Sequence, residues 1–456
     1  MDKSIQGDLK RLETGSIGRL LWDYSIPAVV GTVVMSLYNV IDRIFIGQGV
    51  GTEAIAGLAI TFPVMNVSAA IGVLIGAGAS ARISIMLGAK DREGAQKVLG
   101  NALVLTVMNA IIYIALFAIF LDDILRAFGA SEATLPYARD FMAYILPGML
   151  VMNVSFSFNN VMRASGYPFK AMLTMFIGAG VNVILAPIFL FVFGWGIKGA
   201  AIATDIAMTF SMVFVMAHFF QKSSTLRFVK GIYRLRWKII VGIIGIGAAP
   251  SLVNLASSVI NVIINKTLYL YGSDHAVAAS GIFTTFTSLL VMVVVGICQG
   301  MQPILGYNYG AGRMDRLKKC FWLATLWSSC ICTVGCLFGS LFPGLIARAF
   351  TVDSDLIAVT ERGISLAVCA FWMVGFQIVA TTFFQSIGKA GKSIFLSLTR
   401  QVIFIIPLLL TLPKYFGLEG VWMSFPSSDV CATAVTGLMI WWQFVELRRH
   451  PVVKTV

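Results

Sequence analysis

The chain has 456 residues, of which 58% are hydrophobic and only 12% are charged, and its mean hydropathy is +0.86. These values exclude a water-soluble protein of this size and predict that most of the chain lies in lipid. The formal net charge of +13 does not indicate nucleic-acid binding, because no basic segment belongs to a soluble domain with interleaved aromatic residues.

Apolar runs that can cross a bilayer core need about 20 residues, and the sequence predicts about twelve of them. In the first half they lie near residues 20–46, 54–80, 98–121, 138–162, 170–193 and 197–220. In the second half they lie near residues 237–264, 276–305, 319–343, 362–386, 394–413 and 418–445. We therefore expect an all-α integral membrane protein with twelve transmembrane helices.

Most Lys and Arg residues fall in every second connection, starting with the N-terminus. Examples are Lys90, Arg92 and Lys97, then Arg163 and Lys170, then the basic segment that ends at Lys238. Because cytoplasmic loops carry the excess of Lys and Arg, this alternation predicts a multi-pass membrane protein with both termini in the cytoplasm.

The sequence contains an internal repeat: its two halves are similar, with an offset of roughly 220 residues. Pro27 and Pro250 each open a long apolar run, and fifteen residues later the acid Asp42 in the first copy is matched by Asn265 in the second. Two similar halves around a central site are typical of transporters. We expect an N-terminal lobe over residues 1–225, a cytoplasmic linker over 226–238 and a C-terminal lobe over 239–456.

Several motifs together resemble the multidrug and toxic compound extrusion (MATE) family, over nearly the whole chain, and most closely its bacterial branch of MepA-type and DinF-type exporters. No single motif is decisive, but their order and spacing across the spans carry the resemblance. They are Pro27, the Tyr38–Asp42 segment, the Gly57–Pro63 stretch, Arg163–Gly166, Asn182–Pro187, Gly196–Thr204, Gln299–Pro303, Gly306–Gly312 and Arg400–Gln401.

The resemblance implies two six-helix lobes related by a pseudo-two-fold axis along the membrane normal, with a V-shaped cavity between them. It also implies a secondary transporter that exports cationic or amphipathic organic compounds. Export would occur by antiport with H+ or Na+ while the two lobes rock between outward-open and inward-open states. The resemblance to the bacterial branch also implies a protein of the bacterial plasma (inner) membrane. We expect a monomer whose partners are these small molecules and membrane lipid.

Asp42 is the first candidate for the coupling carboxylate. An ionisable group inside a span is costly, so it usually faces a cavity or a partner and marks function. In the resembling proteins an aspartate at the matching position of the first helix carries cation or proton coupling. The alternative is a structural pair with Arg43, although adjacent helical residues point about 100° apart.

Asn182 and Thr204 match polar residues that accompany that aspartate in the family. The chain departs from the family pattern at Ala186, where an acid often precedes proline, and it carries an unusual acid at Asp205. If the hairpin turns near Trp195, Ala186 and Asp205 lie at the same depth, so Asp205 could supply the missing carboxylate. The alternative is that Asp205 faces another helix or the headgroups.

The identity of the coupling ion stays open at this stage. Hard cations take several oxygen ligands, so a group of Asp42, Asn182 and Thr204, with Asp205 as a second carboxylate, suits Na+. A single carboxyl group suits a proton, because burial moves carboxyl pKa values toward neutral.

The abundance of Met and Phe suits a cavity that adapts to varied amphipathic ligands. Asn159 and Asn160 are either cavity residues or structural links between helices. Our candidates for the cavity lining are Met35, Tyr38, Phe156, Asn159, Asn160, Met175, Phe283 and Gln377.

The second copy has one acid well inside its spans, Asp429. Arg400 is its expected neighbour, because a helix turn near Lys414 places the two residues at similar depth. A structural ion pair is the favoured interpretation, and a role in a second-lobe coupling route is the alternative.

Two other functions are considered. A flippase for a lipid-linked precursor shares the two-lobe plan, but would favour cationic residues in the cavity, and only Arg400 and Arg163 qualify. A membrane enzyme acting on lipid lacks support, since the chain has no His-rich metal cluster, nucleophile elbow or Walker-type loop. We expect no enzyme activity and no cofactor.

Overall fold

The computed structural model describes residues 11–50, 52–132 and 134–449. Within them every regular element is a helix. This follows from the apolar sequence, because in lipid the backbone N–H and C=O groups must bond within their own segment.

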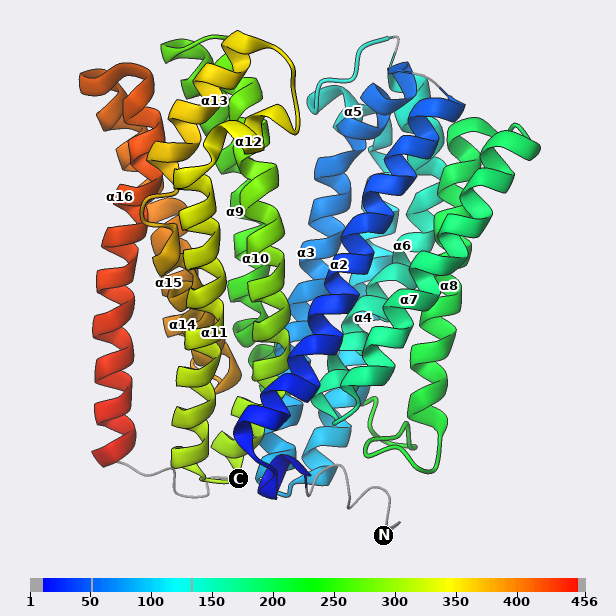
Figure 1. The fold of residues 1–456 in the computed structure, drawn as a ribbon. Coiled ribbons are helices and arrows are strands. Elements are labelled where there is room, and N and C mark those ends of the chain that lie inside the picture. The colour runs from blue at the N-terminus through cyan, green and yellow to red at the C-terminus, as the bar shows by residue number, and fades with distance from the viewer. Residues whose placement is uncertain (1–10, 51, 133, 450–456) are drawn as a thin grey trace.

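The first half of the chain forms one helical bundle (Figure 1). Two short elements interrupt its long helices: α5 follows α4, and the π-helix η1 continues α7 beyond Pro187. The elements are α2 (Ile17–Gly49), α3 (Thr52–Gly88), α4 (Arg92–Ile119), α5 (Leu121–Ala127), α6 (Leu135–Ala164), α7 (Pro168–Pro187), η1 (Ile188–Val192) and α8 (Gly196–Phe220).

The second half forms a second bundle beside the first (Figure 1). It repeats the plan of the first, with the short helix α12 following the third long helix as α5 does in the first bundle. The elements are α9 (Trp237–Tyr271), α10 (Asp274–Gly310), α11 (Met314–Leu341), α12 (Pro343–Arg348), α13 (Ser354–Ala367), η2 (Phe371–Met373), α14 (Val374–Ser386), α15 (Ala390–Leu398), η3 (Thr399–Phe404) and α16 (Ile405–Arg449).

The predicted twelve-span, two-lobe fold is confirmed, although two spans are not single straight helices. Among the described residues ten helical segments are long and apolar enough to cross a membrane, and the pair Ser354–Ala367 and Phe371–Ser386, bent by 51°, makes an eleventh. The last segment, Ala390–Arg449, has 60 residues, which in a straight helix would measure about 90 Å, or about three bilayer cores. Gly417 has φ 56° and ψ −136° inside this segment, and the break divides it into two spans.

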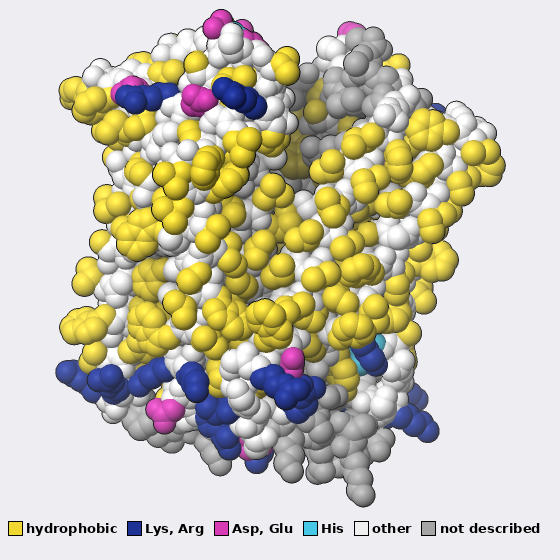
Figure 2. All heavy atoms as spheres, in the orientation of Figure 1, with side chains coloured by type: hydrophobic (Ala, Val, Ile, Leu, Met, Phe, Trp, Pro, Cys, Tyr) yellow, Lys and Arg dark blue, Asp and Glu magenta, His cyan; other side chains and the backbone are white. Residues whose placement is uncertain are grey.

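Basic side chains gather at one end of the two bundles. Figure 2 shows Lys and Arg side chains in a band at the end where α2 begins and α16 ends, below a wide hydrophobic surface. We call this the basic end. The helix α4 begins there, where the carboxylate of Asp91 accepts a 2.8 Å hydrogen bond from the backbone N–H of Gly94.

The two bundles are joined in their basic halves. Glycines allow backbones to meet there: a Cβ at Gly78 would lie 1.9 Å from the carbonyl oxygen of Ile243, and one at Gly310 would lie 1.9 Å from that of Ile85. Polar side chains add cross-bundle bonds, including Arg82 Nη1 to the Lys238 carbonyl oxygen at 3.0 Å. Helices α2 and α3 therefore pack closely against α9 and α10 near the basic end.

Candidate functional site

A cavity of about 420 Å³ opens inside the first bundle, between α2, α3, α6, α7 and α8. Five of its lining side chains are the methionines Met35, Met65, Met152, Met175 and Met208. Among the described residues that line it, none carries a formal charge. The remainder of the lining is Tyr38, Asn39, Phe62, Asn66, Ala69, Gly72, Asn153, Ser155, Phe156, Asn159, Thr174, Thr204 and Ser211.

Small residues let the cavity walls pack closely. A Cβ at Gly31 would lie 2.5 Å from Met175 Sδ, and one at Gly178 would lie 2.5 Å from Ser211 Oγ. The Met175 thioether and the Ser211 hydroxyl thus each lie close to the backbone of a neighbouring helix. Flexible, polarizable methionines with a few fixed polar groups suit ligands of varied shape that carry both apolar and polar parts.

A polar cluster lies at the boundary of this cavity. Asn182 Nδ2 donates a 3.0 Å hydrogen bond to Thr204 Oγ1, and Thr204 Oγ1 donates one of 3.0 Å to the carbonyl oxygen of Ala200. The phenol of Tyr38 lies within hydrogen-bonding reach of Thr204. Asn182 and Thr204 are both buried, so the structure brings together two of the predicted coupling residues and the predicted cavity residue Tyr38.

Asp42 lies one helical turn beyond Tyr38 on α2 and is half-buried. Asp205 follows the cluster residue Thr204 directly on α8. Asp42 and Asp205 are thus the acids next in sequence to the cluster residues Tyr38 and Thr204. The alternative partner, Arg43, has a side chain outside those that the structure describes.

Asp205 points away from its neighbour Thr204, toward α6. A Cβ at Gly148 would lie 1.7 Å from Asp205 Oδ1, so only glycine leaves room for the carboxylate at its present position. Thr204 lines the cavity and Asp205 does not. The two residues thus lie at similar depth but on different faces of α8.

Ala186, where the resembling proteins often carry an acid, is fully buried in an apolar cluster with Ile46, Ala200 and Ala203. The surroundings of this position are therefore those of a packing residue. A carboxylate at this place would need a partner that these apolar neighbours do not offer.

The cavity candidates from the sequence separate into two groups. Six residues named above as cavity or coupling candidates line it: Met35, Tyr38, Phe156, Asn159, Met175 and Thr204. Three lie elsewhere. Asn160 accepts from Arg163 at 3.4 Å, Phe283 packs against Trp422 and Phe425 in the second bundle, and Gln377 donates to the carbonyl oxygen of Asp429 at 2.7 Å.

Several lining residues were not predicted from the sequence, although their helical spacing indicates some of them. On α6, Met152, Ser155, Phe156 and Asn159 recur at the spacing of one helix face, and all four line the cavity. On α8, Thr204, Met208 and Ser211 do the same. Extending each named candidate by three, four and seven residues would have identified these faces.

Arg163 lies at the end of α6, next to the cavity residue Asn159. Its guanidinium is buried and bonds to Asn159 Oδ1 at 3.0 Å and, across the two bundles, to Gln299 Oε1 at 2.7 Å. Its Nε has no hydrogen-bond partner and it forms no ion pair among the residues that the structure describes. Asn159 therefore connects the cavity lining to a positive charge held by amides.

Arg400 and Asp429 form an ion pair in the second bundle, with Nε of Arg400 2.8 Å from Oδ1 of Asp429. The Asp429 side chain is only 6% exposed. Ser428 also donates to the carbonyl oxygen of Arg400, at 3.1 Å, within the π-helix η3. The pair thus holds η3 to α16.

An acid-rich or thiol-rich metal centre is not present in the described part of the chain, where no group of three or more His, Cys, Asp or Glu side chains could hold a metal ion. A cation at the polar cluster would therefore depend on neutral oxygens, from Asn182, Thr204 and Tyr38, as much as on carboxylates.

Known proteins resemble this chain over nearly its full length. The MatE family model matches residues 27–188 and 250–410, more than half of the chain. The multidrug export protein MepA of Staphylococcus aureus is 25% identical over 426 residues, which are 92% of this chain and 93% of MepA. An FAD transporter of Shewanella oneidensis is 28% identical over 436 residues, 93% of this chain and 94% of that protein.

A solved structure gives the same result for the fold. The chain superposes with a TM-score of 0.90 and 25% identity on a multidrug resistance MATE family transporter of the MOP superfamily in an outward-facing conformation. The similarity covers 98% of this chain and 99% of that one.

Proposed function

The chain belongs to the MATE family of multidrug and toxic compound efflux transporters, and we propose that it exports cationic or amphipathic organic compounds by antiport with H+ or Na+. Asp42 is the coupling carboxylate in this proposal, and Asn182, Thr204 and Asp205 act with it. The substrate occupies the cavity of the first bundle. Like its relatives, the protein is a transporter and not an enzyme.

The observation that carries the proposal is the contact between cavity and polar cluster. Tyr38 and Thr204 belong to both, and Asp42 lies one helical turn beyond Tyr38 on α2. An ion that neutralises a carboxylate there changes the charge at the wall of the substrate cavity. A bound organic cation loses its electrostatic partner when the ion arrives, so ion binding and substrate release are coupled.

The energy available is consistent with such an exchange. One elementary charge that moves down a membrane potential of about 100 mV supplies roughly 2.3 kcal/mol. That energy corresponds to a concentration ratio of roughly fiftyfold, since each factor of ten costs about 1.4 kcal/mol.

We propose that the basic end faces the cytoplasm and that the present conformation is outward-open. The first assignment rests on the band of Lys and Arg side chains at that end. The second rests on the close backbone approaches of α3 to α9 at Gly78 and of α3 to α10 at Gly310, which lie in the basic halves of these helices. Transport then requires these contacts to separate.

Replacement of Asp42 tests the proposal. Asp42→Asn keeps the shape and removes the charge, so it should abolish efflux of a cationic dye from cells while the protein remains inserted at the wild-type level. Asp205→Asn should weaken efflux if Asp205 acts in the same cluster. Undiminished efflux by Asp42→Asn would contradict the proposed mechanism.

A second substrate class is favoured by Arg163. The relative from Shewanella oneidensis is an FAD transporter, and FAD carries a pyrophosphate. The guanidinium of Arg163 does not line the cavity, but it is bonded to the cavity residue Asn159 and so adds positive potential behind that wall. Proteoliposomes that take up FAD as readily as a cationic dye would support this class, and uptake of the dye alone would exclude it.

A further inference from the structure

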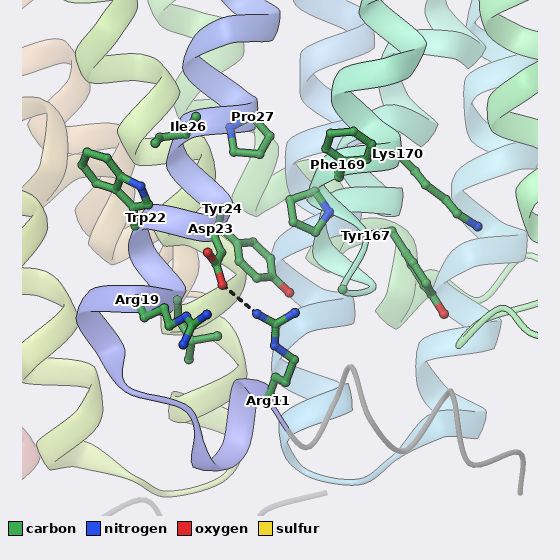
Figure 3. A pocket seen from close by; sticks show the side chains of 13 residues that line it. Arg11, Arg19, Trp22, Asp23, Tyr24, Ile26, Pro27, Tyr167, Phe169 and Lys170 are labelled. Carbon is green, nitrogen blue, oxygen red and sulfur yellow. Dashed lines mark hydrogen bonds and ion pairs between the residues drawn. The ribbon is translucent and has the colours of Figure 1, made fainter.

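A pocket of about 570 Å³ opens at the basic end, outside the cavity described above. Figure 3 shows it between the first turns of α2 and the turn that leads into α7, with Arg11, Asp23 and the Tyr24 hydroxyl in its middle. Its walls are residues 19–27 of α2, except Leu21 and Ser25, and residues 166–170, together with Arg11. It therefore opens at the level where the hydrophobic surface meets the basic band (Figure 2).

The pocket carries an excess of positive charge that is open to solvent. Arg11 and Arg19 are exposed. Arg11 Nη2 bonds Asp23 Oδ2 at 2.7 Å, but their side chains are 62% and 34% exposed, and an exposed pair of this kind is weak. The bond to Asp23 uses one of the five N–H donors of a guanidinium. Arg11 can thus bind a second oxygen anion without giving up Asp23.

The wall above these charges is apolar and equally open. Trp22 is 57% exposed, Ile26 is 38% exposed and Phe169 is 59% exposed. Lys170 contributes its aliphatic stem, since its ammonium lies 3.4 Å from His218 Nδ1 and 3.5 Å from Gln221 Oε1. A ligand that fits must carry a negative group beside a long apolar part.

We propose that this pocket binds an anionic phospholipid from the leaflet at the basic end. Arg11 and Arg19 hold the phosphate, and the acyl chains lie along Trp22, Ile26 and Phe169. Basic pockets between transmembrane helices recognise acidic headgroups in this way, and aromatic side chains favour the same interfacial depth. The site is separate from the export cavity, so it does not depend on the proposed substrate.

Occupancy of the pocket bears on the joint between the bundles. The same turns of α2 pack on α10 with their other face, where Ser25 Oγ donates to the carbonyl oxygen of Ile297 at 3.5 Å and a Cβ at Gly300 would lie 2.6 Å from Ser25 Cα. A lipid held between α2 and α7 supports this part of α2. It therefore favours the conformation in which the basic halves are joined.

Trp22 offers a direct measurement. The protein is placed in nanodiscs of phosphatidylcholine with increasing fractions of phosphatidylglycerol brominated in its acyl chains, and the quenching of Trp22 is the difference between the wild type and Trp22→Phe. We expect half-maximal quenching at a roughly tenfold lower fraction of brominated phosphatidylglycerol than of brominated phosphatidylcholine. Trp441, which is 68% exposed on α16, is the matched control and should show no preference in the same difference with Trp441→Phe.

Three charge variants separate recognition from folding. Arg11→Gln with Arg19→Gln should remove the preference at Trp22, while Lys222→Gln with Lys230→Gln, on the same end but outside the pocket, should leave it. Asp23→Asn breaks the same ion pair as Arg11→Gln but raises the positive charge, so it should strengthen the preference. If Asp23→Asn instead removes the preference, as the double variant Arg11→Gln with Arg19→Gln does, the pair is only structural and the proposal is wrong.

A soluble anion is the remaining source of a phosphate group. Inorganic phosphate at 10 mM, on the order of a cellular concentration, is added to the phosphatidylglycerol titration at constant ionic strength. No change in Trp22 quenching supports a lipid ligand, because the apolar wall adds affinity that phosphate lacks. Loss of the preference, or equal quenching by both lipids at the outset, would overturn the proposal.

Discussion

The guanidinium of Arg163 on α6 and the side-chain amide of Gln299 on α10 join the two bundles, with Nη1 2.7 Å from Oε1. Arg163 is buried and its remaining side-chain partners are amide oxygens of its own helix, Asn159 and Asn160. A charge with such partners is sensitive to the loss of any one of them. The bond from Arg163 to Gln299 therefore helps to hold the joint at the basic end, together with the bonds from Arg82 to Lys238 and from Ser25 to Ile297.

Gln299→Leu should loosen this joint. Loss of the bond leaves the buried N–H donor of Arg163 unsatisfied, at a cost of about 1–3 kcal/mol. A cost of about 1–2 kcal/mol makes the joined state roughly 5- to 30-fold less favoured. The readout is maleimide labelling of Ser84→Cys in a background without the seven native cysteines. Ser84 is buried where α3 meets α10, and a Cβ at Gly306 would lie 2.7 Å from its Cβ.

Gln377→Leu is the matched control for this experiment. It also removes a buried amide, but one that bonds Asp429 and Thr433 within the second bundle. It should lower stability without faster labelling of Ser84→Cys. Equal labelling rates in wild type and Gln299→Leu would show that the bond does not hold the joint.

Gly148→Ala should displace Asp205 without changing any charge. The new methyl group would overlap Asp205 Oδ1, and the carboxylate is the mobile end of its side chain, so it rotates while the helices stay in place. If Asp205 acts in the polar cluster, efflux should fall to the level of Asp205→Asn. Gly437→Ala is the control, since nothing lies within 4 Å of a Cβ there, and wild-type efflux by Gly148→Ala would remove Asp205 from the cluster.

Ala69→Phe should obstruct the export cavity. Ala69 lines the cavity and is exposed into open space, so a phenyl ring there takes up substrate volume rather than straining the core. We expect at least tenfold weaker binding of a large cationic dye, measured by fluorescence polarisation in detergent. Ala115→Phe adds the same ring at an exposed place on α4 away from the cavity, and a similar loss in that variant would refute the location.

Asp429→Asn should destabilise the second bundle and leave transport by the folded protein intact. Removal of one partner of a buried ion pair costs about 3–5 kcal/mol, and the partial exposure of Arg400, at 28%, places the expected loss near the lower end. The thermal midpoint in detergent should fall by several degrees. A strong loss of efflux per folded molecule, with an unchanged midpoint, would instead assign the pair to coupling.

The fold could be predicted from sequence because lipid imposes a strong rule on composition. Each span is a long apolar run, and the duplication marked by Pro27 and Pro250 gives the division into two bundles. The break between α13 and α14 was not predicted, since the composition around Ala367 is apolar on both sides. Gly417 and the nearby Pro413 do mark the turn between the last two spans.

The site could be predicted only in part, because the position of a residue along its helix does not say in which direction around the helix its side chain points. Thr204 and Asp205 are neighbours in sequence, and only the packing of Asp205 against Gly148 separates their directions. Phe283 was chosen for its residue type, yet it packs on Trp422. The pairing of Arg163 with Gln299 joins helices 136 residues apart in sequence, and no local pattern contains that information.

The central claim is that Asp42 couples an ion gradient to export, and dye uptake into everted vesicles tests it most directly. A pH gradient or a sodium gradient is imposed alone, and uptake of a cationic dye is followed by fluorescence in wild-type and Asp42→Asn vesicles with matched protein content. The account predicts uptake in the wild type under one of the two gradients and none in Asp42→Asn. Gradient-driven uptake of equal rate in Asp42→Asn would contradict it.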